Sequence, residues 1–551
     1  MLKKTLVGVP LVLVVLATVV WFNKQALILG FVSNFGKIEN IAPNAAVPWK
    51  DGPDTAPKGE QPPNIIFILA DDLGINDIST FGGGAADGLV QTPHIDALAK
   101  SGAMFTQAYA GSSTCAPSRG MIVTGRYPTR TGFEFTPLPD GAPPIIAMFR
   151  NEEGHAYPTI FHGDAHENAP TFREQGLPAS EVTVAEMLQD AGYHTVHIGK
   201  WHLGEGGEFG PNAQGFDESL LMSSVLFLPV DHPDVVNERL EHSSLDKFLW
   251  ARGQFSTQFN EGPHFEPGGY LTDYWTDESI RVIKANRNRP FFLYLAHWGV
   301  HNPLQATRED YDRFAHIEDH RMRVYAAMIH AVDRSVGRIV ETLEQEGLAE
   351  NTLIVFSSDN GGAPYVGLKD INAPYRGWKA TFFEGGIRVP LFMKWPARIA
   401  PGTQIDGPAG HIDITPTLVA AAGSNVPADI EIDGVNLLPF ATGETEQARP
   451  HETLFWQTAF YRGVRHGDWK LQVSERPNKA WLFNLANDPT EQVNLATERP
   501  DMVAELQLLL DEHAASGRAP LYPHFLELPI AIDRPQLEPI TLEDEYVYFP
   551  N

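Results

Sequence analysis

The chain has a single cysteine among its 551 residues, and its neighbours have types and a spacing that suit chemistry. From Cys115 the sequence reads Cys-Ala-Pro-Ser-Arg-Gly and continues into the apolar residues 121–123. Pro117 suits the first turn of a helix, so Cys115 is predicted at or just before a helix N-terminus. An anion is favoured there, and Arg119 would lie one turn along the same face. A buried, unreactive cysteine is the alternative, but the pattern favours a reactive side chain beside a cation.

A second set of residues offers oxygen ligands. Asp71 and Asp72 directly follow one predicted strand, and Asp359 and Asn360 follow another. Carboxylate and amide oxygens suit a hard cation, Ca²⁺ or Mg²⁺, rather than Zn²⁺. Three carboxylates brought together would repel one another strongly without a cation. An isolated Asp-Asp pair is also typical of a helix N-cap, so the prediction of a metal site depends on both pairs occurring together.

Basic and proton-bearing residues form a third set. Lys200 and His202 follow another predicted strand, and His301 lies just past a fourth. His297 and His301 have the spacing of a zinc-binding pair on a helix. The apolar strand before them and Pro303 after them argue against a helix there. The two histidines are therefore not read as a zinc pair, and no catalytic role is predicted for His297.

The elements that must position these residues alternate between short apolar runs and helical patterns. That alternation predicts an α/β fold, with a large, mostly parallel sheet flanked by helices. Such sheets bind ligands outside the carboxyl ends of their strands, which is where all the polar sets stand. Strands are predicted at 64–70, 194–199, 290–296, 352–357 and 389–394, and helices at 93–101 (capped by Thr92), 182–191 and 322–346.

The composition shifts after residue 441. Two antiparallel strands are predicted within 454–473, so a small C-terminal subdomain with an antiparallel sheet, plus a tail, is predicted for 441–551. The catalytic α/β domain is predicted for 64–440. Residues 133–180 and 227–269 are rich in Pro, Gly, His and aromatic residues. They could rim the active-site pocket or be ordinary surface loops, and the sequence leaves both readings open.

The N-terminal residues have the pattern of an export signal. Lys3 and Lys4 precede an uncharged and mostly apolar run of 18 residues at 5–22. Positive charge before an apolar segment of spanning length predicts that the rest of the chain is translocated. No small-residue cleavage site directly follows, so an uncleaved signal anchor at 1–35 is favoured over a cleaved peptide. Residues 36–63 are predicted as a linker. The catalytic domain is thus expected in the periplasm or extracellular space, anchored to the membrane.

The charge balance limits the classes of partner. Lys and Arg number 41 against 69 Asp and Glu, which gives a net charge of −28. Such a surface repels nucleic acid, so we predict no nucleic-acid partner. A small anion could still bind where a few basic side chains converge. One cysteine excludes an intramolecular disulfide framework.

The segment from Cys115 to Gly125 resembles the signature of the sulfatase family, in which Cys-x-Pro-Ser-Arg is followed by an apolar stretch and Thr-Gly. The resemblance runs from about residue 64 to about residue 496. The other segments that carry it are 70–74 and 358–362 at the two metal-binding strand ends, 199–204 with Lys200 and His202, His301-Asn-Pro, and 376–390 with Lys379.

The resemblance implies a cofactor and a modified residue. Cys115 would be converted to Cα-formylglycine by a formylglycine-generating maturation enzyme. The metal would be Ca²⁺, with Mg²⁺ as an alternative. Its ligands would be Asp71, Asp72, Cys115, Asp359 and Asn360, and the catalytic residues would be Cys115, Arg119, Lys200, His202, His301 and Lys379.

The resemblance also implies roles in the hydrolysis of sulfate monoesters. A hydroxyl of the hydrated aldehyde would attack sulfur, and Asp359 is placed to accept its proton. Lys379 and His301 would bind the sulfate and protonate the leaving alcohol. His202 would remove the proton of the second hydroxyl, which releases sulfate. Arg119 and Lys200 would hold the hydrate and offset charge.

Several alternatives stay open at this point. The substrate could be an aryl, sugar or lipid sulfate, either a small molecule or an oligosaccharide. A phosphonate monoester or phosphate diester hydrolase on the same scaffold is the second reading, because phosphate and sulfate share a shape. A binding protein on an inactive enzyme scaffold is the third. Decay of that kind should have removed at least one of the motif residues, and all are present.

Overall fold

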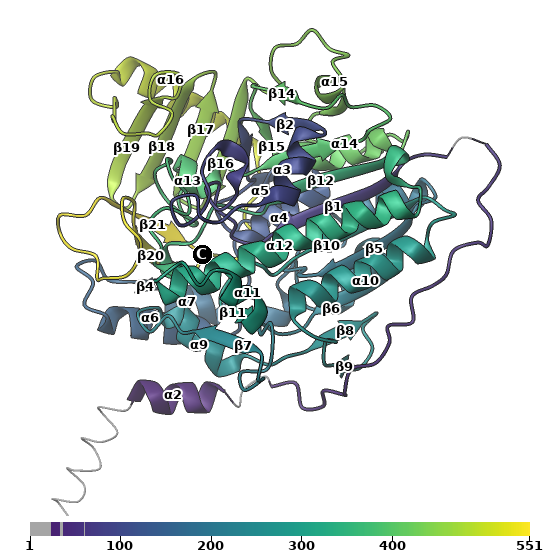
Figure 1. Ribbon diagram of the computed structural model, residues 1–551. Coiled ribbons are helices and arrows are strands. Elements are labelled where there is room, and N and C mark those ends of the chain that lie inside the picture. The colour runs from purple at the N-terminus through teal and green to yellow at the C-terminus, as the bar shows by residue number, and fades with distance from the viewer. Residues whose placement is uncertain (1–23, 34–36, 60) are drawn as a thin grey trace, which may run out of the picture.

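The structure is a computed structural model that describes residues 24–33, 37–59 and 61–551 (Figure 1). Its centre is a ten-stranded sheet in the order β14-β2-β13-β12-β1-β10-β5-β6-β8-β9. The five central strands run parallel: β12 (Thr352–Ser358), β1 (Asn64–Ala70), β10 (Phe291–Ala296), β5 (His194–Gly199) and β6 (Glu218–Met222). The predicted fold class is confirmed.

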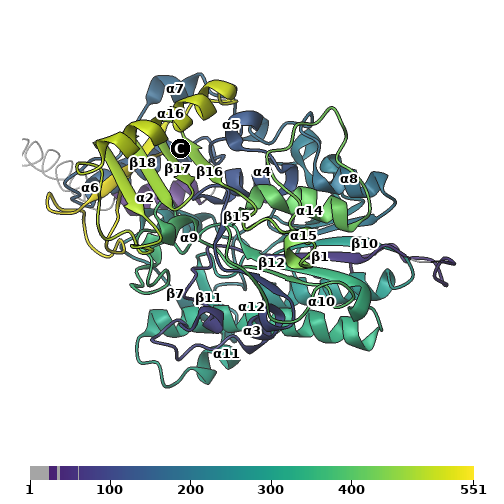
Figure 2. The same ribbon diagram turned by 90° about the horizontal axis from the view of Figure 1, so that it is seen from above.

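Both faces of the sheet are covered, which explains the long apolar runs of the central strands β1, β10 and β12. All seven residues of β1 are buried. Ile66 and Ile68 belong to one hydrophobic cluster, whereas Ile65, Phe67 and Leu69 belong to another on the opposite face. Figure 2 shows the two helical layers. One contains α3 (Pro93–Lys100), α10 (Leu271–Ala285) and α12 (His320–Gln345), and the other contains α4 (Cys115–Thr124), α8 (Val184–Asp190) and α14 (Ile414–Ala421).

The edges of the sheet depart from parallel order. The strand predicted at 389–394 is β13 (Leu391–Lys394), which runs antiparallel to β12 and to β2 (Ala103–Phe105). At the far edge β8 (Thr257–Phe259) and β9 (His264–Phe265) also pair antiparallel. β14 (Thr403–Ile405) runs parallel to β2. Of the strands that the structure describes, only β14 and β9 have one side without a partner strand in this sheet.

Two of the predicted helix starts are held in different ways. Thr183 caps α8 in a reciprocal capping box with Glu186, as the sequence pattern favours. Thr92 occupies the N-cap position of α3, but its hydroxyl accepts no hydrogen bond from the helix. Instead the carboxylate of Asp333 on α12 accepts from the N–H groups of His94 and Ile95, at 3.0 and 2.8 Å. The expected cap by Thr92 is therefore wrong, because a tertiary partner supplies the acceptor.

The C-terminal part carries its own antiparallel sheet, at the side of the large sheet in Figure 1. Its strands follow the order of the chain: β16 (Thr453–Thr458), β17 (Tyr461–His466), β18 (Trp469–Glu475) and β19 (Asn478–Asn484). α16 (Pro500–Ser516) packs on it through Leu506 and Leu510. A third sheet joins the tail strands β20 (Leu526–Ala531) and β21 (Tyr546–Pro550) to β4 (Ile160–Phe161). The sequence analysis did not predict this sheet.

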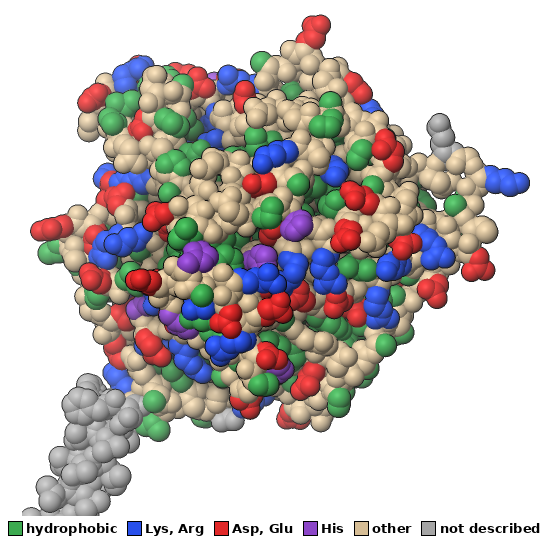
Figure 3. Space-filling view, viewed as in Figure 1, with side chains coloured by type: hydrophobic (Ala, Val, Ile, Leu, Met, Phe, Trp, Pro, Cys, Tyr) green, Lys and Arg blue, Asp and Glu red, His purple; other side chains and the backbone are tan. Residues whose placement is uncertain are grey.

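Smaller elements complete the fold. The remaining helices are α2 (Lys24–Val32), α5 (Pro128–Thr131), α6 (Ala142–Glu152), α7 (Gly163–Glu167), α9 (Ser244–Arg252), α11 (Arg308–Arg313), α13 (Glu384–Ile387) and α15 (Leu438–Ala441). The remaining strands are β3 (Ala108–Tyr109), β15 (Ala409–Gly410), β7 (Val235–Glu238) and β11 (Leu304–Thr307). Basic and acidic side chains are interleaved over the face seen in Figure 3.

The predicted apolar segment 5–22 lies outside the described residues. Within the described ranges, no helix has the length and apolar character needed to cross a membrane. Part of the predicted linker 36–63 is packed rather than free. Val47 and Trp49 are buried, and the Trp49 indole N–H donates to the carboxylate of Glu278 at 2.6 Å. The linker therefore runs along the surface of the α/β domain.

Candidate active site

Two neighbouring strand ends bring the predicted metal ligands together. β1 and β12 are parallel partners in a register that pairs Ala70 with Ser358, so the residues after each strand emerge side by side. The Asp72 N–H donates to Asp359 Oδ1 at 3.2 Å, and Asn360 Nδ2 donates to Asp72 Oδ1 at 2.7 Å. All four predicted oxygen ligands are buried.

α4 delivers Cys115 and Arg119 to the same edge. The helix begins at Cys115 after the N-cap residue Thr114, so the predicted position at a helix N-terminus is confirmed. Cys115 Sγ lies 3.6 Å from Asp71 Oδ1 and 3.7 Å from Asp72 Oδ1. One turn later the Arg119 guanidinium reaches Asp71 through Nη2 and Asp359 through Nε, at 2.9 Å each.

Two lysines complete the ionic cluster. Lys200, after β5, lies with its Nζ 2.6 Å from Asp71 Oδ2. Lys379 reaches the Asp72 carboxylate at 2.7 and 2.9 Å, and its Nζ is 3.1 Å from Cys115 Sγ. With Arg119, three cations thus face three carboxylates around Cys115.

The histidines separate as expected. His301 Nε2 lies 3.6 Å from Asp72 Oδ2, and its Nδ1–H donates to the carbonyl of Asn302 at 2.6 Å. His297 instead lies with its Nε2 2.9 Å from Ser335 Oγ on α12, and no helix joins the two histidines. His202 is half-buried, and its buried Nδ1 has no hydrogen-bond partner.

Comparisons with known proteins identify the family. Residues 63–424 match the family model described as Sulfatase, and residues 376–516 match the one described as N-sulphoglucosamine sulphohydrolase, C-terminal. The chain belongs to the sulfatase family. The chain is 33% identical to the human N-acetylgalactosamine-6-sulfatase over 82% of this chain and 86% of that protein. It is 32% identical to the human steryl-sulfatase over 78% of this chain and 77% of that protein.

A solved structure gives the same answer. The crystal structure of Ps i-CgsB in complex with k-i-k-neocarrahexaose has a TM-score of 0.67 and 30% identity, and the match covers 84% of this chain and 95% of that one. The sulfatase described here is therefore a sulfuric ester hydrolase, and it hydrolyses sulfate esters. Of the reactions that the sequence left open, this is the one that the family supports.

The electrostatics of the sulfatase site are set by burial and by close charges. Burial and the charge of Asp359 raise the pKa of Asp71 to about 6. Burial would also raise the pKa of Asp72, but the charges of Lys379 and Lys200 hold it below its ordinary value. Burial raises the pKa of the Cys115 thiol, which therefore stays protonated at neutral pH.

The pKa values of the two imidazoles and of Lys379 shift in opposite directions. Burial lowers the pKa of both His202 and His301, and neighbouring cations add to this, so both rings are neutral. Burial would lower the pKa of Lys379 too, but Asp72 outweighs it and keeps the ammonium charged. The site thus holds a charged donor beside neutral imidazoles.

The donor set fits a hard cation. Asn360 Oδ1 is buried and has no hydrogen-bond partner, although Asn360 Nδ2 has two. A buried acceptor left unpaired beside three carboxylates is what an oxygen-ligated cation would satisfy. Asp71, Asp72, Cys115 and His301 place ligand atoms within 4.8 Å of one another. A ring nitrogen of His301 thus lies close to the residues that the resemblance assigned to the metal.

Sequence reasoning missed two aromatic residues that touch the site. The Tyr365 hydroxyl donates to Asp72 Oδ2 at 2.8 Å and lies 3.3 Å from Lys379 Nζ. The Trp298 ring stacks on His301, with centroids 3.9 Å apart, and Lys200 Nζ is 4.7 Å from its centre. Tyr365 follows the Asp-Asn-Gly-Gly segment and Trp298 follows β10, so proximity to those motifs was the one available signal.

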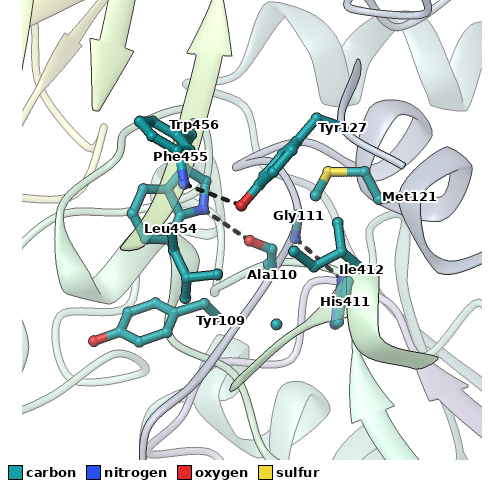
Figure 4. Close-up of a pocket in the computed structure, with 11 residues that line it drawn as sticks. Tyr109, Ala110, Gly111, Met121, Tyr127, His411, Ile412, Leu454, Phe455 and Trp456 are labelled. Carbon is teal, nitrogen blue, oxygen red and sulfur yellow. Dashed lines mark hydrogen bonds between the residues drawn. The ribbon is translucent and has the colours of Figure 1, made fainter. Parts of the chain in front are cut away.

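His411 contacts the first turn of α4 and the segment that precedes it. Its Nδ1 lies 2.9 Å from Ser118 Oγ and accepts from the Gly111 N–H at 3.2 Å. Figure 4 shows it at the wall of a small pocket, with Met121 and Trp456 also lining it. Cys115 does not line this pocket, so the pocket is packing space between α4 and the C-terminal sheet and not the substrate site.

Proposed function

We propose that this sulfatase acts through Cα-formylglycine at position 115. The observation that carries the proposal is the placement of Cys115 Sγ among two carboxylates and Lys379. Such surroundings leave a thiol protonated and a poor nucleophile. A hydrated aldehyde there supplies one hydroxyl to attack sulfur and a second to release the product.

The protein residues around position 115 have distinct roles in this proposal. Arg119 holds Asp71 and Asp359 in place and offsets their charge, while Lys379 donates a proton to the leaving alcohol oxygen. The His301 Nδ1–H donates to a carbonyl, so the neutral ring has its lone pair on Nε2, which lies 3.6 Å from Asp72 Oδ2. An arriving sulfate ester would favour protonation of that nitrogen. His202, neutral and with Nδ1 unpaired, is suited to accept a proton.

We further propose that Asp71, Asp72, Asp359 and Asn360 hold one Ca²⁺ together with residue 115, with Mg²⁺ as the alternative. When bound, the cation lowers the pKa of the attacking hydroxyl and polarises the sulfate oxygens. Support comes from the unpaired Asn360 Oδ1 and from the crowding of three carboxylates.

Sulfated sugars are the substrate class that we propose. N-acetylgalactosamine-6-sulfatases recur among the relatives, and the similar crystal structure was solved with a neocarrahexaose. Because steryl-sulfatase is also a relative, a lipid sulfate is the second candidate. Rates on a 6-sulfated galactosamine, a steroid sulfate, an aryl sulfate and an aryl phosphate diester would rank these classes.

Mass spectrometry of the peptide that contains Cys115 tests the modification. We expect an aldehyde in place of the thiol in the active fraction, and full activity with an intact thiol would overturn the proposal.

For the metal, Asp359→Asn should lose both the bound cation and the activity, whereas Asp190→Asn, at the exposed end of α8, should keep both. A chelator that strips all divalent metal without slowing the reaction would contradict the metal proposal.

The location of the enzyme is also a proposal. Lys3-Lys4 and the apolar run 5–22 support export, with the catalytic domain held outside the inner membrane. Protease should digest the domain once an outer barrier is permeabilised. Complete protection while the inner membrane is intact would reverse the topology.

A further inference from the structure

A second group of metal-ligating side chains lies where the C-terminal tail meets the segment around β4. It consists of His162, directly after β4, His524, just before β20, and Glu527 within β20. One ligand atom from each lies within 4.8 Å of the others. None of the three belongs to the catalytic cluster. His524 and Glu527 also lie beyond residue 516, where the second family match ends.

The two imidazoles converge on one carboxylate oxygen. His162 Nε2 is 2.6 Å from Glu527 Oε1, and His524 Nε2 is 3.5 Å from the same oxygen. The rings stand nearly perpendicular, with centroids 5.5 Å apart. The Glu527 side chain is 2% exposed, whereas those of His162 and His524 are 34% and 26% exposed. A buried anionic ligand thus lies beneath two imidazoles that solvent can reach.

The backbone holds this arrangement. β4 pairs antiparallel with β20, so that Phe161 faces Leu526 and Ile160 faces Glu527. The His162 N–H extends the ladder by donating to the carbonyl of Phe525 at 2.9 Å. Ligands fixed by paired strands lose little freedom when an ion binds, which favours binding.

The surrounding charges also allow a cation. Arg476 Nη1 lies 3.1 Å from Glu527 Oε2, which orients the carboxylate and leaves Oε1 facing the imidazoles. Arg476 is 47% exposed, so solvent screens much of its charge.

We propose that His162, His524 and Glu527 bind a divalent transition-metal ion, with Zn²⁺ as the ion that fits best. Two imidazole nitrogens and one carboxylate favour Zn²⁺ over Ca²⁺ or Mg²⁺, which prefer all-oxygen sites. Three protein ligands leave the fourth tetrahedral position to water. The ion would link the C-terminal tail to the segment that follows α6. The two metal sites of this chain would therefore differ in chemistry.

Calorimetric titration of the full-length protein with Zn²⁺, in excess Ca²⁺ that occupies the catalytic site, tests this proposal. We expect one zinc ion to bind and to raise the thermal unfolding midpoint. His162→Ala and His524→Ala should each weaken that binding by at least about tenfold, and Glu527→Gln should do so while preserving the shape of the side chain. Hydrolysis of an aryl sulfate with Ca²⁺ should be unchanged in the two histidine variants.

The matched control is His166→Ala. His166 packs its ring on Phe161 and Phe525 beside the cluster but is not one of the ligands, so zinc binding should survive its loss. Asp359→Asn should also keep this zinc site, which separates it from the catalytic metal. Absence of zinc binding in the Ca²⁺-loaded protein, or binding unchanged in both His162→Ala and His524→Ala, would overturn the proposal.

Discussion

Two buried ionic clusters in this molecule use the same side-chain types in different ways. The first is the catalytic cluster around Cys115. The second, here called the anchor cluster, joins α13 to the C-terminal sheet. Its residues are Tyr109, Glu384, Arg388, Lys470 and Glu491. In the anchor cluster Lys470 Nζ lies 2.8 Å from Glu384 Oε1 and 2.9 Å from Glu491 Oε1.

The anchor cluster is saturated. The Glu384 carboxylate also accepts hydrogen bonds from Arg388 and from the Tyr109 hydroxyl, at 3.0 Å each. The Glu384 backbone N–H donates to the Glu491 carboxylate at 2.6 Å. Of the buried side-chain nitrogen and oxygen atoms described in this cluster, none lacks a hydrogen-bond partner. In the catalytic cluster Asn360 Oδ1 and His202 Nδ1 do lack one. A saturated network holds a fold together, whereas one left partly unsatisfied has capacity for a ligand.

The largest effect should come from Cys115→Ala. Because residue 115 supplies the nucleophile in the proposed mechanism, its removal should lower kcat on an aryl sulfate by at least about 1,000-fold. The thermal unfolding midpoint should change little, because Cys115 offers only a small apolar contact. Steady-state rates and thermal unfolding of the same preparations check this. A large loss of stability would mean that the catalytic cluster also holds the fold.

Lys470→Met should lower the stability of the fold rather than the rate of catalysis. It leaves Glu384 and Glu491 buried without their shared cation and should cost about 3–5 kcal/mol of unfolding free energy. Activity per folded molecule should survive. Lys479→Met is the matched control on the neighbouring strand, because Lys479 pairs with Glu545 at the surface and should matter by less than about 1 kcal/mol. If the two substitutions lowered the unfolding free energy equally in denaturant, the anchor cluster would not have the structural role assigned to it.

Trp298→Leu should have an intermediate effect on catalysis. Its ring stacks on His301 and lies near Lys200 Nζ, so it positions both groups. We expect kcat to fall about tenfold, more for poor leaving groups than for activated ones, with a smaller change in KM. Trp469→Leu, in the C-terminal sheet, is the control. Equal losses across a leaving-group series would show that Trp298 does not act through His301.

The smallest effect concerns pH and the anchor cluster. Burial and the charge of Glu384 raise the pKa of Glu491 to about 7, despite Lys470. Its contribution to stability is therefore fully present below its unfolded value of 4.5 and is lost as the pH rises through about 7. The unfolding midpoint should fall by a few degrees between about pH 5 and about pH 8.5. Glu491→Gln should flatten that slope, and Glu475→Gln, at an exposed site, should leave it in place.

The sequence predicted the catalytic edge well because its signals are local. Strands β1, β10 and β12 contain long apolar runs, and Asp71, Asp359 and Lys200 each directly follow the end of a strand. Cys115 and Arg119 come instead from the start of α4. Parallel order then brings Asp71 and Asp359 to the same edge. Tyr365 and Trp298 carry no such signal, because they reach the cluster through turns whose paths depend on packing.

What the sequence determined by itself is thus four of the five central strands together with β13, the helix that begins at Cys115 and the edge where the polar residues gather. These follow from apolar periodicity and from the residue types at strand ends. The tertiary structure decided the rest. It replaced Thr92 by Asp333 as a helix cap, turned β13 antiparallel, and paired Lys470 with Glu384 and His162 with Glu527, 86 and 365 residues apart. Such pairings depend on which surfaces meet when the layers pack, and no local pattern in the chain encodes that choice.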